Sequence, residues 1–483
     1  MIKLDNSIIE GLATNASATK NGKDLVNKGK FNNLHINNEQ DLIWGECAGS
    51  GKTPYRCSVD FIDEHNPVGR CSCPSRQFPC KHALGLMYAY VDGLSFSIAE
   101  PAEDLLNKRE KVETRKQKKE QEKVSLKDKA AKPKKVNKAT LLKKYNAQMQ
   151  GLELADKLFN QIIKNGLSSI DAQERSNLKK QVKELGNYHI NGIQAAFDTL
   201  ITLTGAKIST DQLISQINLL GAILKKAKTY IQERIDNPEL TPEIDSSIEE
   251  LIGTIWKLTD LISLGLYKEN VELIQLAYTS IELNSKQDSI NEGVWFDLSS
   301  CQIYRTYNHV PAKAKKYIKE EDSIFEVLQL KDLYIYPGDK TTRRIRWEDN
   351  TQAYRPLVST DYINIINNAD SDYASLIKEI KGSIKNPMNT KSPFALLSLE
   401  KVYQVEDNLV IEDTKGNRLT LINDTDNEGT SVINTTENLK NFLPNEVKSM
   451  ALLVRFRTNL TEGTLYVEPV SLITEQKIIR LLF

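Results

Sequence analysis

Apolar and polar positions alternate along this chain with more than one period. Between about residues 141 and 283, apolar side chains recur every three or four positions, which is typical of helices that bury one face. From residue 393 onward, short runs of alternating apolar and polar residues lie between turn residues and indicate β-strands. Residues 291–390 mix the two patterns. These periods predict an α+β fold built from several domains.

The first hundred residues carry a pattern of their own. Residues 1–40 are polar and rich in asparagine, with one short helix expected near positions 8–13. Alternating runs at 42–48 and 55–61 flank a Gly-Ser-Gly-Lys turn and predict a β-hairpin, followed by a third strand at 69–73. The apolar positions after it fit one helical face up to an Asp-Gly pair. A small ββα-type domain is therefore expected.

The glycine-rich turn at 49–53 contains part of a phosphate-binding loop motif. In that motif a first glycine lies five positions before the second, and here the residue five positions before Gly51 is Glu46. Pro54 follows at once and no helical pattern opens after it, so there is no helix N-terminus to hold a phosphate. The turn is therefore expected to join two strands of the hairpin.

A chain of 483 residues exceeds what one hydrophobic core usually supports. The patterns predict five parts: 1–100 as a small N-terminal domain, 101–140 as a charged Lys-rich linker, 141–290 as an α-helical domain, 291–390 as a mixed α/β region and 391–483 as a β-rich domain. Within the helical part, residues 249–266 and 271–283 are expected to form an antiparallel helix pair. The last part is compatible with a small barrel, as in oligonucleotide-binding barrels, and also with many unrelated sheets.

Six cysteines occur in the chain, and three of them lie within ten positions beside a histidine. Cys71 and Cys73 form a Cys-x-Cys pair, and Cys80 and His82 form a Cys-x-His pair. Side chains two positions apart on a strand point to the same side, so both sulfurs of the first pair can reach one ion. The second pair falls where the predicted helix begins.

Three thiols and an imidazole make a complete tetrahedral set for Zn²⁺ with no open position for an activated water. We therefore expect one structural zinc ion, bound by Cys71, Cys73, Cys80 and His82, whose binding stabilises the segment around it. Of the remaining thiols, Cys47 and Cys57 are expected to pack in the strand core, with a role as alternative ligands left open.

The net charge excludes no class of binding partner, because 64 lysine and arginine residues match 64 aspartate and glutamate residues. The distribution is uneven, since residues 108–144 hold sixteen basic residues and five acidic ones, a net charge of +11. This stretch has almost no apolar face, so it is expected to be a solvated tether. It could also contact phosphate backbones, and the sequence leaves both alternatives open.

A second basic cluster lies at Arg343, Arg344 and Arg346, beside Trp347. On a strand, Arg344 and Arg346 share one face. The cluster is a candidate site for an anion or an acidic partner, and the competing interpretation is a solvated strand whose charges pair within the chain.

The sequence at 70–83, Arg-Cys-Ser-Cys-Pro-Ser-Arg-Gln-Phe-Pro-Cys-Lys-His-Ala, resembles the SWIM zinc finger. The Gly-Ser-Gly-Lys-Thr-Pro-Tyr turn before it and the later Tyr-Pro-Gly and Arg-Arg-Ile-Arg-Trp segments are similar to long bacterial SWIM-domain proteins. The resemblance implies zinc binding together with DNA binding or protein-protein interaction. It also implies a MoxR-like AAA ATPase or a von Willebrand A-type protein as a partner.

No catalytic constellation emerges from the sequence, because the five histidines are scattered and the clustered cysteines are committed to zinc. We therefore expect no enzyme activity and assign no catalytic residue. The absence of a signal-peptide pattern and of a long apolar run indicates a cytoplasmic protein without a membrane partner. Two functions remain: an adaptor that binds other proteins, which the even charge favours slightly, and a DNA-binding protein that uses the finger and the linker.

Overall fold

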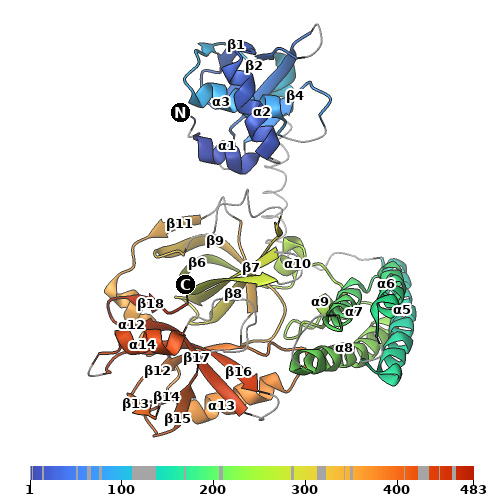
Figure 1. Ribbon diagram of the computed structural model, residues 1–483, viewed down its shortest axis with the longest axis vertical. Coiled ribbons are helices and arrows are strands. Elements are labelled where there is room, and N and C mark those ends of the chain that lie inside the picture. The colour runs from blue at the N-terminus through green and yellow to red at the C-terminus, as the bar shows by residue number, and fades with distance from the viewer. Residues whose placement is uncertain are drawn as a thin grey trace. The chain divides into compact units, whose positions relative to one another are not determined.

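The structure is a computed structural model in which both helices and strands are abundant (Figure 1). It describes residues 2, 4–13, 16–49, 53–62, 67–75, 79–110, 137–167, 170–205, 210–283, 288–312, 323–341, 343–348, 352–406, 408–422, 434–444, 447–459 and 464–482. They form two compact units, the first holding the described residues up to Glu110 and the second most of those from Asn137 onward. The mixed α+β class predicted from the sequence is confirmed.

In the first unit, one mixed sheet packs against helices. The sheet has the strand order β4-β3-β2-β1-β5, and helix α3 packs on β2, β3 and β4, with α1 and α2 packed on α3. The elements are α1 (Asn6–Leu12), α2 (Ala16–Asn27), β1 (Phe31–Ile36), β2 (Leu42–Cys47), β3 (Tyr55–Asp60), β4 (Val68–Cys71), α3 (Lys81–Val91) and β5 (Ser97–Ile98). Apolar side chains from all three helices and from β1 to β3 form its core.

The predicted hairpin is confirmed as β2 and β3, which pair antiparallel from Leu42 opposite Asp60 to Cys47 opposite Tyr55. Residues 50–52 of its turn lie outside the described residues. The third strand and the helix after it are confirmed as β4 and α3. The sequence analysis missed α2 and β1, because their polar, asparagine-rich residues form only a thin apolar stripe.

The second unit begins with a helical bundle that shares one apolar core. Its helices are α5 (Lys138–Asn165), α6 (Ala172–Leu185), η2 (Gly186–Tyr188), α7 (Asn191–Leu203), α8 (Thr210–Asp236) and α9 (Ile248–Ile252), followed by the short α10 (Leu258–Ser263). Gly166 ends α5 with a φ of 79°, a conformation that glycine adopts readily. Helical structure is confirmed for most of this region.

The predicted helix pair at 249–266 and 271–283 is wrong. Gly253, with a φ of 143°, separates the short helices α9 and α10, and Tyr267–Leu283 is a strand of 17 residues, β6. Its sequence Val-Glu-Leu-Ile-Gln-Leu-Ala-Tyr-Thr-Ser-Ile-Glu-Leu fits both a helical and an alternating pattern. The segment forms a strand because it pairs with β7 and β9, which lie later in the chain.

Strand β6 is the first strand of a closed barrel, here called the first barrel. Strand β10 pairs with β8 on one side and with β9 on the other, and β7 and β6 complete the ring. Apolar side chains such as Val271, Trp295 and Leu330 form one core cluster with Ile345 of β10. The strands are β6, β7 (Asp288–Asp297), β8 (Ile303–Val310), β9 (Val327–Ile335) and β10 (Arg343–Arg346), with β11 (Gln352–Arg355) added on the edge of β9.

A second barrel follows and is built from the β-rich end of the chain. Its elements are α12 (Ser359–Asn367), α13 (Tyr373–Ile384), β12 (Phe394–Ser398), β13 (Lys401–Val405), β14 (Asn408–Glu412), β15 (Arg418–Leu421), α14 (Thr435–Phe442), β16 (Ala451–Asn459), β17 (Thr464–Ile473) and β18 (Ile478–Arg480). Strands β12 and β13 are consecutive parts of one segment, which pairs with β16 through its first half and with β14 through its second. That segment closes the ring, and α13 and α14 add apolar side chains to the core.

Both barrels have the same connectivity. The first three strands are sequential neighbours, the third runs parallel to the fifth, and the fourth returns between the fifth and the first. This is the connectivity of the five-stranded oligonucleotide-binding (OB) barrel. The sequence analysis expected a barrel only at 391–483, and the structure adds another before it.

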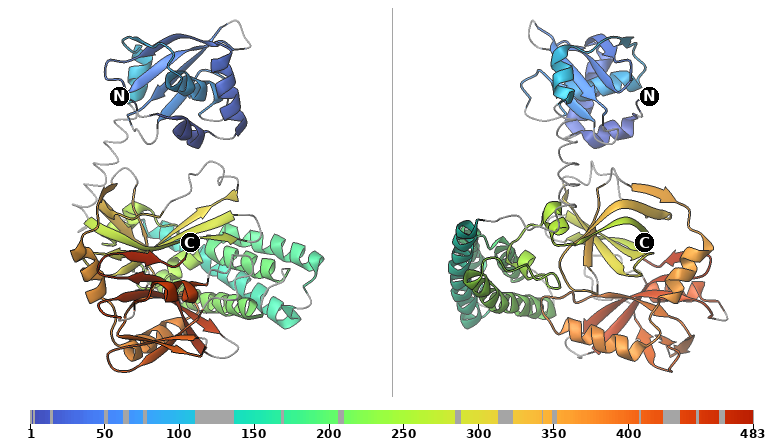
Figure 2. Two further views of the ribbon diagram at one scale, coloured as in Figure 1. Left: turned by 60° about the vertical axis from the view of Figure 1, so that its left-hand side comes forward. Right: turned by 180° about the vertical axis from the view of Figure 1, so that it is seen from behind.

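The two barrels pack on each other through an apolar interface, with the helical bundle to one side of them (Figure 2). Val294 and Phe296 of the first barrel lie in one buried cluster with Phe394 and Leu453 of the second. A buried hydrogen bond of 2.7 Å, donated by the Ser471 hydroxyl to the carbonyl of Leu276, joins them as well.

The turn between β7 and β8 depends on the buried carboxylate of Asp297. It accepts hydrogen bonds from the ammonium of Lys268 at 2.9 Å and from the hydroxyls of Ser299 and Ser300, both at 2.7 Å. Burial alone would raise the pKa of Asp297, but these bonds outweigh it and lower the pKa to about 2. The ionised form is therefore the one that the fold stabilises.

We expect Asp297→Asn to lower the free energy of unfolding at pH 7 by about 2 kcal/mol, because the folded pKa lies below the ordinary value of 3.8. This contribution is complete above the unfolded pKa and is lost as the pH falls toward the folded one, so about half of it should be gone by pH 3. Urea unfolding at both pH values measures it. The exposed control Glu379→Gln on α13 should change stability by less than about 0.5 kcal/mol. An equal loss for Asp297→Asn at both pH values would contradict the assignment.

Candidate metal centre

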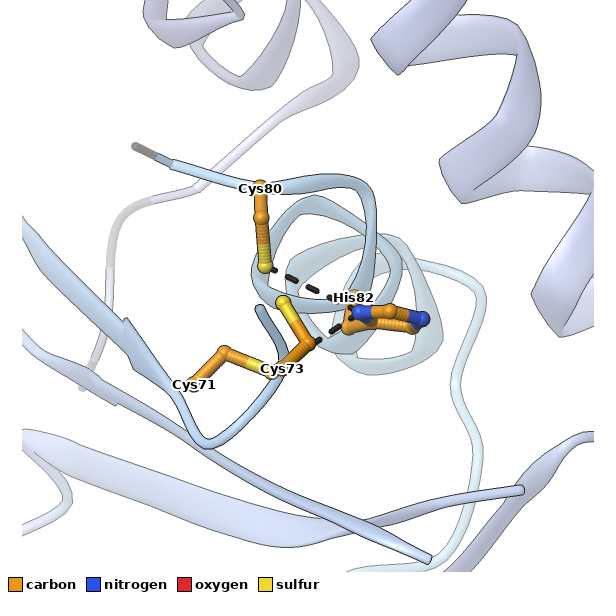
Figure 3. Close-up of side chains that lie close together, drawn as sticks. All are labelled: Cys71, Cys73, Cys80 and His82. Atoms are coloured by element: carbon orange, nitrogen blue, oxygen red, sulfur yellow. Dashed lines mark hydrogen bonds between the residues drawn. The ribbon is translucent and has the colours of Figure 1, made fainter. Parts of the chain in front are cut away.

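The four predicted ligands come from two elements of the first unit. Cys71 is the last residue of β4, and Cys73 lies in the bend that follows it. Cys80 is the N-cap residue of α3, and His82 lies in its first turn. The strand ends earlier than expected, at Cys71, so the bend turns the Cys73 side chain toward the helix (Figure 3).

The structure brings these side chains together. Their sulfur and nitrogen atoms all lie within 4.8 Å of one another. The Nδ1 atom of His82 is 3.7 Å from the sulfur of Cys71 and 3.9 Å from that of Cys80. Ligand bonds of about 2.0 to 2.3 Å in a tetrahedron place neighbouring ligand atoms roughly 3.5 to 3.8 Å apart. The cluster is thus close to the size that one zinc ion requires.

Packing around the cluster holds strand and helix close together. A Cβ atom on Gly69 of β4 would lie 3.1 Å from the Cβ of Ala83 in α3, so a larger residue would push the two apart. The ring of Tyr55 lies beside that of His82, with centroids 4.8 Å apart. Cys73, Cys80 and His82 are buried, and Cys71 is partly exposed. The ligands are therefore held in place by the apolar core of the unit.

Without a metal, the thiols of Cys71 and Cys80 are poor acids. The neighbouring thiol of Cys57, together with burial, raises the pKa of Cys71. The thiol of Cys71 and burial raise the pKa of Cys80 to about 11. A bound cation reverses this preference, because thiolate is the form that ligates zinc. Uptake of the ion at neutral pH therefore releases protons, and three thiolates with one imidazole suit a closed structural site.

The residues from 55 to 91 match the family model of the SWIM zinc finger. This segment is a SWIM zinc finger. The match spans β3, β4 and α3, so it contains all four ligands and the strand that pairs with β4. The finger, its Cys3His ligand set and one structural zinc ion agree with the sequence analysis.

No curated protein matches this chain. Two solved structures share 9% sequence identity with it. A murine DNA-binding protein bound to double-stranded DNA has a TM-score of 0.19, over 44% of this chain and 98% of that one. A replication protein A heterotrimer bound to single-stranded DNA has a TM-score of 0.13, over 48% and 71%. Scores this low carry no argument about fold or function.

The other residues singled out from the sequence lie elsewhere. Cys47 and Cys57 are buried in the core of the first unit, as expected. In the second unit, Arg343 forms an ion pair with Asp245. Arg344 pairs with Glu250 at 3.0 Å. These two contacts agree with the interpretation of charges paired within the chain. Arg346 is exposed, and its role as an anion site stays a prediction.

Purified protein should contain about one equivalent of zinc by elemental analysis. The double variant Cys73→Ala, Cys80→Ala should contain almost none, because two remaining ligands bind zinc weakly. Cys301→Ala is the matched control: this partly buried thiol lies in the second unit, so its loss should leave the metal content unchanged. Full metal content in the double variant would disprove the site.

Removal of zinc by a chelator should expose the amides of β4 and α3 to hydrogen exchange. The apparent free energy of a structural zinc site is on the order of 10 kcal/mol, more than a small domain usually has in reserve. The helical bundle and the barrels have cores of their own, so their protection should not change. Exchange followed by mass spectrometry tests this, and a uniform loss of protection along the chain would contradict it.

Proposed function

We propose that the chain is a zinc-stabilised binding protein whose second barrel binds single-stranded nucleic acid. The observation that carries the proposal is the outer face of β13 and β15, where Lys401, Arg418 and Thr420 are exposed on either side of β14 in a barrel of OB connectivity. OB barrels bind oligonucleotides across the face of their second and third strands, which here are β14 and β15.

The equivalent face of the first barrel is covered along its second strand. Its second strand is β7, whose outward side chains Val294 and Phe296 are buried against the second barrel. The second barrel contributes β12, β16 and β17 to that interface, and its strands β13 to β15 lie away from the first barrel (Figure 1). The outward side of β7 is therefore covered, whereas Lys401, Arg418 and Thr420 of the second barrel are exposed.

This open face combines basic and aromatic side chains around one carboxylate. Glu412 accepts hydrogen bonds from Lys401 at 3.2 Å, Tyr403 at 3.1 Å and Arg418 at 2.7 Å. The side chains of Lys401 and Arg418 remain 58% and 63% exposed, although both are paired. The guanidinium of Arg418 lies 5.1 Å from the centre of the Tyr403 ring. Thr420 extends the face on β15 and is exposed.

Such a face can hold a nucleotide by two kinds of contact. Glu412 neutralises one of the two positive charges of Lys401 and Arg418 and orients both side chains. A net positive charge is therefore left to bind a phosphate. Bases stack on aromatic rings and on guanidinium planes, and the stacked pair of Tyr403 and Arg418 offers both. The predicted basic stretch at 108–144, of which 111–136 lie outside the described residues, would add non-specific phosphate contacts.

A second candidate function is the protein adaptor. Strand β11 pairs with β9, and within the described residues its other edge pairs with no strand. Tyr354 on this strand is 48% exposed, and the nearby Val358 and Ile363 are 51% and 42% exposed. An open edge beside apolar side chains suits an extended peptide that adds a strand. The AAA ATPase or von Willebrand A-type partner implied by the resemblance would bind in this way.

Both candidates are binding functions without catalysis, in keeping with a zinc site that keeps no open position. None of the six cysteines is in a disulfide, which is consistent with the proposed cytoplasmic location. No helix among the described residues is long and apolar enough to cross a bilayer.

The nucleic-acid proposal is tested with Thr420→Glu, which adds a negative charge to the open face and removes no contact of Glu412. We expect the Kd for a fluorescent oligo-dT strand to rise about fivefold, since one repulsion of about 1 kcal/mol opposes the phosphates. Tyr403→Leu should cost about 1 to 3 kcal/mol of stacking. Fluorescence anisotropy at several salt concentrations gives the Kd and the salt slope.

Thr199→Glu is the matched control, because it makes the same change at an exposed position of α7. It should leave the Kd unchanged. Equal weakening by both substitutions, or a wild-type protein without salt-dependent binding, would refute the role of this face. The adaptor would be favoured if the Thr420→Glu variant still bound an extended peptide partner and a variant altered in β11 did not.

A further inference from the structure

A fourth thiol lies beside the zinc ligands without belonging to them. Cys57 of β3 and Cys71 of β4 are directly opposite each other in the antiparallel pair. Their sulfur atoms are 3.5 Å apart, closer than either ligand contact to His82. Cys57 stands outside the group of four that can share one ion.

We propose that Cys57 and Cys71 form a disulfide in the presence of peroxide and that this bond removes Cys71 from the zinc site. The inference rests on the zinc centre and is independent of the nucleic-acid proposal. It assigns Cys57 a chemical role in addition to the core packing that its burial provides.

The backbone geometry suits such a bond. Residues directly opposite each other in antiparallel strands have Cα atoms about 4.5 to 5.5 Å apart, and disulfides span roughly 4.4 to 6.8 Å. The sulfurs must approach from 3.5 Å to about 2.05 Å. Rotation of the two side chains can supply this approach, so the strands can keep their register.

Exposure determines which sulfur reacts first. Cys71 is partly exposed, whereas Cys57 is only 3% exposed. The thiolate of Cys71 attacks hydrogen peroxide, which gives a sulfenic acid and hydroxide. The thiol of Cys57 then attacks this sulfur, the S–S bond forms, and the oxygen leaves as water. Two thiol sulfurs have then lost two electrons, and the peroxide has been reduced to water and hydroxide.

The bond changes what the site can hold. A disulfide sulfur is no longer a thiolate, so three ligands remain: Cys73, Cys80 and His82. The site then no longer links β4 to α3 directly, because Cys71 is its ligand on β4. Reduction of the disulfide restores the thiol, so a reductant with added zinc should rebuild the site.

Peptide mapping of the full-length zinc-loaded protein after treatment with hydrogen peroxide tests the proposal. We expect a Cys57–Cys71 linked peptide, and zinc release in proportion to it, measured with a chromogenic chelator. Cys57→Ala should release zinc at least fivefold more slowly at the same peroxide dose, with an unchanged metal content before treatment. Dithiothreitol and zinc should reverse the release in the wild type.

Cys47→Ala is the control, since Cys47 is an equally buried thiol of the same core and lies one strand further from Cys71. It should behave as the wild type. Zinc release from Cys57→Ala at the wild-type rate, or a disulfide confined to Cys71, Cys73 and Cys80, would overturn the proposal. If Cys57→Ala folds poorly, Cys57→Val replaces it, and the peptide map of the wild type decides on its own.

Discussion

The first unit depends on the convergence of three thiols and one imidazole between a strand end and a helix start. Helix α3 is the centre of that unit, with its residues from His82 to Ala89 buried between the sheet and the helices α1 and α2. The metal site ties the first turn of this helix to β4. A bound ion therefore stabilises the packing of the whole unit, because the other elements pack against the helix that it anchors.

The ligand set and its surroundings could be predicted from sequence because their signal is local. Cys-x-Cys and Cys-x-His spacing, strand alternation and a helix start all lie within about forty residues. The first barrel could not be predicted in the same way. Strand β6 has apolar residues that fit either period, and only its pairing with strands further along the chain excludes a helix.

The arginine cluster at 343–346 shows that candidate sites, too, depend on contacts between distant parts of the chain. A cluster of three in four positions looks like an anion site in the sequence, yet Asp245 and Glu250 lie about a hundred positions earlier and engage two of them. Conversely, Lys401, Tyr403 and Arg418 are unremarkable in the sequence. They become neighbours only because β13, β14 and β15 pair side by side around Glu412. Sequence spacing predicts sites within one element better than sites across strands.

The apolar interface between the barrels has a consequence for how the chain can be divided. A fragment that ended between β11 and β12 would expose Val294 and Phe296 on one piece and Phe394 and Leu453 on the other. It would also leave the hydroxyl of Ser471 without its carbonyl acceptor. Such pieces would tend to aggregate through the uncovered surface. We therefore expect the smallest fragment of this region that folds as a monomer to contain both barrels.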